Sequence, residues 1–397
     1  MEQQIKKRIE SIDILRGIVM VIMALDHVRD FFHFSANTAN PMDLAITTPF
    51  LYFTRWITHF CAPVFIFLSG TSIYLQSLRK TKSELSRFLI TRGIWLILLE
   101  IVVSTFGWSF NPSYPAVFMQ VIWAIGISMV LMGAFIFFPY WLILTLALII
   151  VFGHNTLDFF EQQPDFKTSL IWDLMHHGVF KTYEIIKGHS MLILYPFLPW
   201  AGLMMLGYCL GKLYTNDFKE TTRLRYLKIK GFSLILFFIV LRASNLYGNP
   251  SDWTTQKTWL FSVLSFLDVE KYPPSLLYLC MTMGPALLGL AYLENIKSKL
   301  TDGFKVFGRV ALFYYVLHIY LIHLLCMLVF FAKGHNMSEA VNPESHFPFY
   351  FVITGEGFSL TGVYLIWLIV LAILFPVCKK YDAYKTKHKE KKWLSYF

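Results

Sequence analysis

The run Ser11-Ile12-Asp13-Ile14-Leu15-Arg16-Gly17, followed after an apolar stretch by Asp26-His27, places ionisable groups inside a segment with the composition of a membrane helix. Arg16 and His27 are eleven residues apart, close to three helical turns, so their side chains share one face about 16 Å apart along the axis. Asp13 falls on nearly the same face, whereas Asp26 is rotated about 100° from His27. Charged groups are costly in hydrocarbon and normally face a protein interior or a water-filled cavity, which makes this helix a candidate functional element. The alternative is that Asp13 and Arg16 lie at the membrane interface and that His27 is a packed core histidine.

The composition indicates a membrane protein. The 397 residues are 56% hydrophobic and only 15% charged, and the mean hydropathy is +0.53. A soluble protein carries roughly a quarter charged residues. The apolar residues also lie in blocks long enough to cross a bilayer, which takes about 20 residues each. We therefore expect an all-α, polytopic integral membrane protein with one transmembrane domain over 1–397. The five cysteines lie in or beside apolar segments and indicate neither a disulfide framework nor a metal site.

The apolar blocks predict ten membrane spans. Their expected bounds are 12–33, 50–77, 88–108, 117–137, 139–153, 191–214, 229–247, 274–294, 308–332 and 350–377. Lys and Arg concentrate before the first span and after every second span, in residues 6–8, 79–87, 212–230, 297–305 and 379–392. The positive-inside rule then places both termini in the cytoplasm, and we expect the protein in the cytoplasmic (inner) membrane. The net charge of +10 comes from these segments and does not indicate a nucleic-acid partner.

This orientation sorts the polar residues by depth. Arg16, Arg92 and Arg309 lie near the cytoplasmic side, where guanidinium groups could clamp the phosphates of a nucleotide. The alternative is that they are ordinary positive-inside residues. His27 and His59 lie deeper and are the candidate catalytic groups. The residues expected to line an outer cavity and bind a substrate there are His189, Arg242, Asn245 and Tyr272. Glu100 and His318 lie near the midplane, and His318 could simply hydrogen-bond a neighbouring helix.

This distribution fits a transferase that takes an acyl group from cytoplasmic acyl-coenzyme A and delivers it to an acceptor outside. An imidazole would remove the acceptor's hydroxyl or amine proton, or briefly carry the acyl group. His27 is the first candidate for this role and His59 the second. A transporter for a small anion or a lipid-linked solute is the alternative, because intramembrane Arg, His and Glu suit it as well. A third possibility is a non-catalytic protein of the same fold.

The pair Arg16 and His27 resembles the arginine–X10–histidine signature of membrane-bound acyltransferases that acylate sugars. Residues 11–17 together with Phe60-Cys61-Ala62-Pro63-Val64-Phe65-Ile66-Phe67-Leu68-Ser69-Gly70 resemble the catalytic domain of heparan-alpha-glucosaminide N-acetyltransferase, and most of all its bacterial relatives. The core of the resemblance covers about 8–215, with further helices over 229–378 and a basic tail over 379–397.

The resemblance implies acetyl-coenzyme A as the acyl donor, a sugar or lipid-linked acceptor, no metal, and a histidine at the centre of the transfer. This chain departs from the lysosomal member of the family. That enzyme has an asparagine in place of His27, and its proposed catalytic histidine lies in the loop after the first span, where this chain has only His33. The identity of the acceptor, the acyl chain length and any homo-oligomeric state are left open by the sequence.

Overall fold

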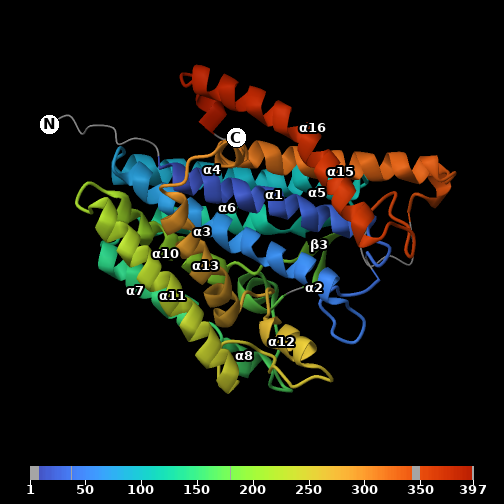
Figure 1. Cartoon of the computed structure of the whole chain (residues 1–397), viewed down its shortest axis with the longest axis horizontal. Helices are drawn as coiled ribbons and strands as arrows, with labels where there is room; N and C mark the ends of the chain where they lie inside the picture. The colour runs from blue at the N-terminus through green and yellow to red at the C-terminus, as the bar shows by residue number, and fades with distance from the viewer. Residues whose placement is uncertain (1–8, 37, 179, 342–348, 396–397) are drawn as a thin grey trace.

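Helix α1 (Glu10–Phe32) lies at the centre of a bundle of long helices (Figure 1). The computed structural model describes residues 9–36, 38–178, 180–341 and 349–395. Helix α1 packs against α3, α13, α14, α15 and α16, and it is buried on most of its faces, as expected for a helix that is apolar nearly all round. Its first turn carries the acidic Glu10 and Asp13 and its last turn the basic Arg29, so these charges interact favourably with the helix dipole. The helix that carries the predicted signature is therefore the core of the fold.

Each of the ten predicted spans contains a helix. These helices are α1, α2 (Pro49–Trp56) continued through η1 (Ile57–Phe60) and α3 (Cys61–Ser77), α4 (Lys82–Leu99) continued through η2 (Glu100–Ser104) and α5 (Thr105–Ser109), α6 (Val121–Phe135), α7 (Tyr140–Gly153), α10 (Leu198–Leu210) followed by η4 (Gly211–Tyr214), α11 (Glu220–Ser244), α13 (Leu276–Leu293), α15 (Ala311–Ala332) and α16 (Leu360–Lys387). Five segments within the described residues are long and apolar enough to cross a membrane, namely Pro49–Ser77, Lys82–Ser109, Leu276–Leu293, Ala311–Ala332 and Leu360–Lys387. The helical membrane class is thus confirmed, and the count of ten spans stays a prediction.

Shorter elements join these helices. They are α8 (Thr156–Glu161), α9 (Leu170–Trp172), η3 (Asp173–His177), α12 (Trp259–Leu267), α14 (Lys299–Arg309), η5 (Met337–Glu339) and η6 (Lys392–Ser395). A three-stranded sheet has the order β1-β3-β2, with β1 (Ala116–Met119) parallel and β2 (Thr182–Ile186) antiparallel to β3 (His189–Ile193).

The expected bounds were wrong at several spans. Residues 117–119, expected in the fourth span, belong to β1, and α11 begins at Glu220 rather than at 229. The stretch 191–193 was expected at the start of the sixth span but forms part of β3, and α10 begins only at Leu198. Pro196 and Pro199 explain the delay, since the residue before a proline avoids the helical region and proline itself fits the first turn of a helix. The tenth span was expected from 350, but α16 begins at Leu360, after Gly355 with its positive φ of 78°. Helix α16 also continues to Lys387, so the first residues of the basic tail are helical.

Contacts between helix ends agree with a chain that alternates in direction. Arg223 at the start of α11 forms an ion pair with Glu294 just after α13, and Lys82 at the start of α4 donates to the carbonyl oxygen of Phe137, just after α6, at 3.1 Å. The start of α11 therefore lies beside the end of α13, and the start of α4 beside the end of α6. The basic residues 6–8 lie outside the described residues.

We expect the basic segments before the first span and after every second span to face the cytoplasm. In a Lys389→Cys variant, a membrane-impermeant thiol reagent applied to intact cells should give no labelling, whereas Asp165→Cys should be labelled. All five native cysteines are buried, which keeps the background low. Permeabilised cells provide the control, because Lys389→Cys should then react. Labelling of Lys389→Cys in intact cells would reverse the orientation.

Helices α1 and α14 approach each other closely through two glycines. A Cβ atom at Gly308 would lie 1.9 Å from the carbonyl oxygen of Asp13, and one at Gly17 would lie 1.8 Å from the carbonyl oxygen of Phe304. Neither backbone can move away cheaply, because each belongs to a packed helix. This contact fixes the end of α14, and with it Arg309, against α1.

The Gly308→Ala variant is expected to lose about 1–3 kcal/mol or more of folding free energy, the usual cost of overpacking a core. Gly303→Ala on the same helix is the matched control, since the nearest atom to its new Cβ is 3.8 Å away and alanine favours a helix over glycine by up to about 1 kcal/mol. Thermal unfolding of the purified variants in detergent measures the difference. Equal stability of the two variants would contradict the close approach.

Candidate active site

A cavity of about 1770 Å³ follows helix α1 along its length. Arg16 near the start of α1, His27 in its second half and His33 just after its end all line it. The other walls come from α3, α4, α6, α15 and the loop before α13. One compartment therefore connects the two ends of the bundle, and its lining changes in character from one end to the other.

The end of the cavity near the start of α1 is basic. The Arg16 guanidinium donates to the carbonyl oxygen of Gly308 at 3.3 Å and to Ser72 Oγ at 3.3 Å, and it lies 3.5 Å from Asp13 Oδ1. Arg309 reaches the other oxygen of Asp13 at 3.8 Å and Asp382 at 3.4 Å. The carboxylate of Asp13 thus holds both guanidinium groups at the same wall of the cavity.

Further basic residues line this end. They are Arg92, Lys80, Lys385, Lys389 and Lys391. The predicted convergence of Arg16, Arg92 and Arg309 on one space is therefore seen in the structure. The four lysines were interpreted from the sequence only as orientation signals, and nothing in their spacing distinguished them from the other lysines of the loops and tail.

His27 forms a pair with His318 from α15. The His27 Nδ1 and His318 Nε2 atoms are 2.7 Å apart, and His318 Nδ1 lies 3.1 Å from the carbonyl oxygen of Tyr314. A carbonyl oxygen can only accept, so in a neutral pair His318 Nδ1 carries a proton and its Nε2 accepts from His27 Nδ1. The Nε2 atom of His27 is then left with its lone pair, the form required of a base or nucleophile.

Packing fixes the orientation of the His27 ring. The indole of Trp108 meets it edge-on with ring centroids 4.7 Å apart, and His318 stacks on it at 4.9 Å. The hydrogen-bonding partner of this ring is therefore the imidazole of His318.

Two other histidines line the cavity. His59 in η1 is buried, and its Nδ1 atom has no hydrogen-bond partner within the described part of the chain. His33 lies just after α1, with its Nδ1 atom 2.8 Å from Ser35 Oγ. His59, the second predicted candidate, therefore lines the same cavity as His27.

Charged side chains cluster where α1 ends. Asp26 forms ion pairs with Arg29 at 2.7 Å and with Arg55 from α2, and Arg29 also pairs with Asp30 at 2.6 Å. All four residues line the cavity. The carboxylate of Asp26 is thus held by arginines and does not serve His27, as their 100° separation on the helix predicted. Sequence reasoning missed Arg29 and Arg55, although Arg29 has the i, i+3 spacing from Asp26 that pairs charges on a helix.

The loop before α13 supplies the facing wall at this end. Asp268, Glu270, Lys271 and Tyr272 line the cavity there. Burial raises the pKa of the carboxyl groups of Asp268 and Glu270. Each of these acids therefore keeps its proton to a higher pH than an exposed carboxyl group and can donate as well as accept a hydrogen bond. Tyr272 is the one predicted outer residue that lies in this wall.

The other predicted outer residues lie elsewhere. Arg242 is buried, and its guanidinium donates to the carbonyl oxygens of Ser251, Ser265, Phe266 and Asp268 at 2.6 to 3.1 Å. Its role in the structure is to brace the loop that carries Asp268 into the cavity.

Three more of the predicted residues are not part of the cavity lining. Asn245 exchanges side-chain hydrogen bonds with the backbone of Trp253. His189 is exposed on β3, with its Nδ1 atom 2.9 Å from the carbonyl oxygen of Tyr114. Glu100 is buried, and its carboxylate accepts from the backbone N–H of Trp123 at 3.0 Å.

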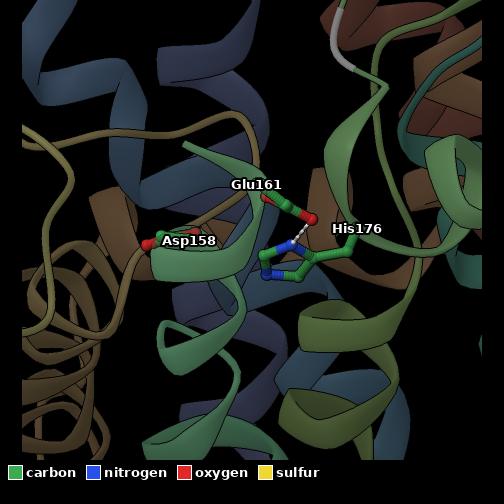
Figure 2. Close-up of side chains that lie close together, drawn as sticks. All are labelled: Asp158, Glu161 and His176. Carbon is green, nitrogen blue, oxygen red and sulfur yellow. Dashed lines mark hydrogen bonds and ion pairs between the residues drawn. The ribbon is translucent and has the colours of Figure 1, made fainter. Parts of the chain in front are cut away.

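A second group of ionisable side chains lies away from the cavity, between α8 and η3. Figure 2 shows His176 directed at Glu161, with Asp158 beside them, and their potential ligand atoms all lie within 4.8 Å of one another. Both nitrogens of His176 already have partners, since Nδ1 is 2.7 Å from Glu161 and Nε2 is 3.1 Å from His154 Nδ1. We interpret this group as a hydrogen-bonded network that holds η3 against α8 and against His154 at the end of α7.

The helical membrane fold and the cavity with one basic end define a membrane protein with a site buried between its helices. The family model for heparan-alpha-glucosaminide N-acetyltransferase, catalytic, matches residues 8–247. The match covers more than half of the 397 residues, and the chain belongs to this family, which is one of membrane acyltransferases. No curated protein matches the chain. The matched region includes Arg16, His27, Arg55 and His59, whereas His318, Arg309 and α16 follow it.

Proposed function

We propose that this protein transfers an acetyl group across the membrane, from acetyl-coenzyme A bound at the basic end of the cavity to an acceptor at the opposite end. The observation that carries the proposal is one cavity along α1, with Arg16 near one end, His27 beyond it and a mixture of acidic and basic side chains, several of them in ion pairs, at the other end. Guanidinium groups suit the phosphates of the coenzyme. Arg16 and His27 are separated by eleven residues of one helix, about 16 Å, which the pantetheine arm of the donor would bridge.

His27 is the proposed general base. Its Nε2 atom accepts the proton of the acceptor's hydroxyl or amine group as that oxygen or nitrogen attacks the thioester carbonyl carbon. The carbon–sulfur bond then breaks, the acetyl group stays on the acceptor, and the proton passes from His27 to the coenzyme A thiolate. His318 would hold the ring in the tautomer with a free Nε2 lone pair. Transfer through an acetylated His27 uses the same lone pair and is the alternative order of events.

The opposite end of the cavity suits a polar acceptor. Carboxyl groups of Asp268 and Glu270, the Asn249 amide and the Tyr272 ring lie together there, and this combination of hydrogen-bonding groups with an aromatic face is typical of sites for sugars. We therefore propose a sugar or a lipid-linked sugar as acceptor, on the outer face of the cytoplasmic membrane.

The test is a transfer assay with the purified protein in liposomes. Acetyl-coenzyme A labelled in the acetyl group is supplied on the side of the basic end, and a panel of sugars on the other side. We expect release of free coenzyme A thiol that depends on one class of acceptor, with label recovered in that acceptor. Label that crosses the bilayer without thiol release would support a transporter. Binding of acetyl-coenzyme A without either event would support a non-catalytic protein.

A further inference from the structure

The C-terminal tail turns back at the end of α16 and forms part of the basic end of the cavity. Helix α16 ends at Lys387, and η6 follows at Lys392–Ser395. Lys391 donates to the hydroxyl group of Tyr384 at 2.7 Å, and Leu394 is only 3% exposed. A basic segment that was expected merely to mark the cytoplasmic side is thus anchored to the bundle by an apolar side chain and a hydrogen bond.

Of the six tail lysines whose side chains the structure describes, three line the cavity and three do not. Lys385, Lys389 and Lys391 belong to the lining, together with Lys80 at the end of α3. Lys379, Lys380 and Lys387 are exposed and lie outside the lining. Lys385 and Lys387 are two residues apart in the last turn of α16 and point to different faces of the helix, whereas Lys389 and Lys391 follow its end, where the chain turns back. The tail therefore directs a selected set of its charges towards one space.

The carboxylates at this end are already engaged by other cations. Asp13 holds Arg16 and Arg309, Asp382 also holds Arg309, and Glu390 lies 3.2 Å from His388. Cations gathered in a cleft focus the field and raise the local concentration of an anionic ligand. A ligand that reaches both the arginines of α1 and α14 and the tail lysines needs more than one anionic group, separated along its length.

We propose that Lys385, Lys389 and Lys391 bind the 3′-phosphate of the adenosine moiety of the acyl donor, while Arg16 and Arg309 bind its diphosphate. This inference rests on the proposed use of acetyl-coenzyme A. The thioester must reach His27, so the diphosphate lies at the arginines and the adenosine 3′-phosphate lies farther out, beside the tail. The tail, which lies beyond the family match over 8–247, would then distinguish coenzyme A from its form without the 3′-phosphate.

Binding of acetyl-coenzyme A and of 3′-dephospho-acetyl-coenzyme A to the full chain in nanodiscs of neutral lipid tests the proposal. The parent protein should prefer acetyl-coenzyme A by about tenfold or more, the scale of a charge-assisted contact. In K385Q/K389Q/K391Q this preference should fall to about one, through weaker binding of acetyl-coenzyme A alone. The matched triple variant K379Q/K380Q/K387Q carries the same change in charge and should keep both affinities within about threefold, because exposed charges contribute little.

The outcomes separate this inference from the proposed function. If the parent binds neither ligand, the proposed use of acetyl-coenzyme A fails. If the parent binds acetyl-coenzyme A and K385Q/K389Q/K391Q keeps the preference, or loses affinity for both ligands equally, the assignment of the 3′-phosphate is overturned. A lipid phosphate is the other source of the same chemistry. Binding is therefore also measured in nanodiscs that contain phosphatidylglycerol. If K385Q/K389Q/K391Q changes the binding only in these nanodiscs, the lysines bind lipid phosphate and the proposal is overturned.

Discussion

The His27→Ala variant should lose acetyl transfer by a factor of about 10² to 10⁴, the usual contribution of a general base, while its affinity for acetyl-coenzyme A stays within a few-fold of the parent. The reason is the position of the ring. His318 fixes Nδ1 of His27 at 2.7 Å, which leaves the Nε2 lone pair for the reaction, whereas the phosphate-binding groups lie about three helical turns away. Steady-state release of coenzyme A thiol and direct binding of the acyl donor measure the two quantities separately.

Two further variants test whether the loss of activity is specific to His27. His318→Ala removes the partner of His27 but no group that meets the substrate, so it should reduce turnover less than His27→Ala and shift its pH dependence. His335→Ala, at a half-buried position after α15 and outside the cavity lining, serves as the control for the loss of a histidine. An active His27→Ala protein together with an inactive His59→Ala protein would move the chemistry to η1. Full activity of both would contradict a histidine mechanism in this cavity.

The central part of the site was predictable because one helix carries it. Arg16 and His27 lie on α1, and a helix of 3.6 residues per turn fixes their common face and their separation without any tertiary information. The convergence of Arg92 and Arg309 on Arg16 was also predictable, since the positive-inside rule places all three near the same side of the bundle.

The partners of these residues were not predictable, because they come from distant parts of the chain. His318 reaches His27 from α15, 291 residues away, and the choice among several helices that could face His27 depends on packing. The close approach of α14 to α1 depends on Gly17 and Gly308 in the same way. Arg242 was predicted to line a cavity, but its guanidinium binds the carbonyl oxygens of a loop. The expected depth of a residue in the membrane does not determine whether its side chain faces a cavity or a neighbouring loop.

The second large effect is expected on the binding of the acyl donor, in variants of the cavity arginines Arg16 and Arg309. Arg16→Ala should weaken the binding of acetyl-coenzyme A by about tenfold to a hundredfold, the range for a hydrogen-bonded contact between charged groups. Ser72 and the carbonyl oxygen of Gly308 hold the Arg16 side chain at the cavity wall, so its guanidinium is already oriented for an anion. Arg16→Lys keeps the charge but loses the planar pair of donors, and it should give an intermediate affinity.

Arg309→Ala tests the other half of the pair, and Arg87→Ala is the control for both, since Arg87 lies exposed on α4 outside the cavity lining. Calorimetric binding constants should separate the two cavity arginines from Arg87, and thermal unfolding of each variant shows whether a loss of affinity reflects a loss of fold. Removing either cavity arginine also leaves part of the charge of the buried Asp13 without its partner, next to the remaining guanidinium group. The two single losses should therefore not add in the double variant, because arginines that share one carboxylate are coupled. Parent-like affinity in both Arg16→Ala and Arg309→Ala, with the fold intact, would exclude these guanidinium groups as the site of the phosphates.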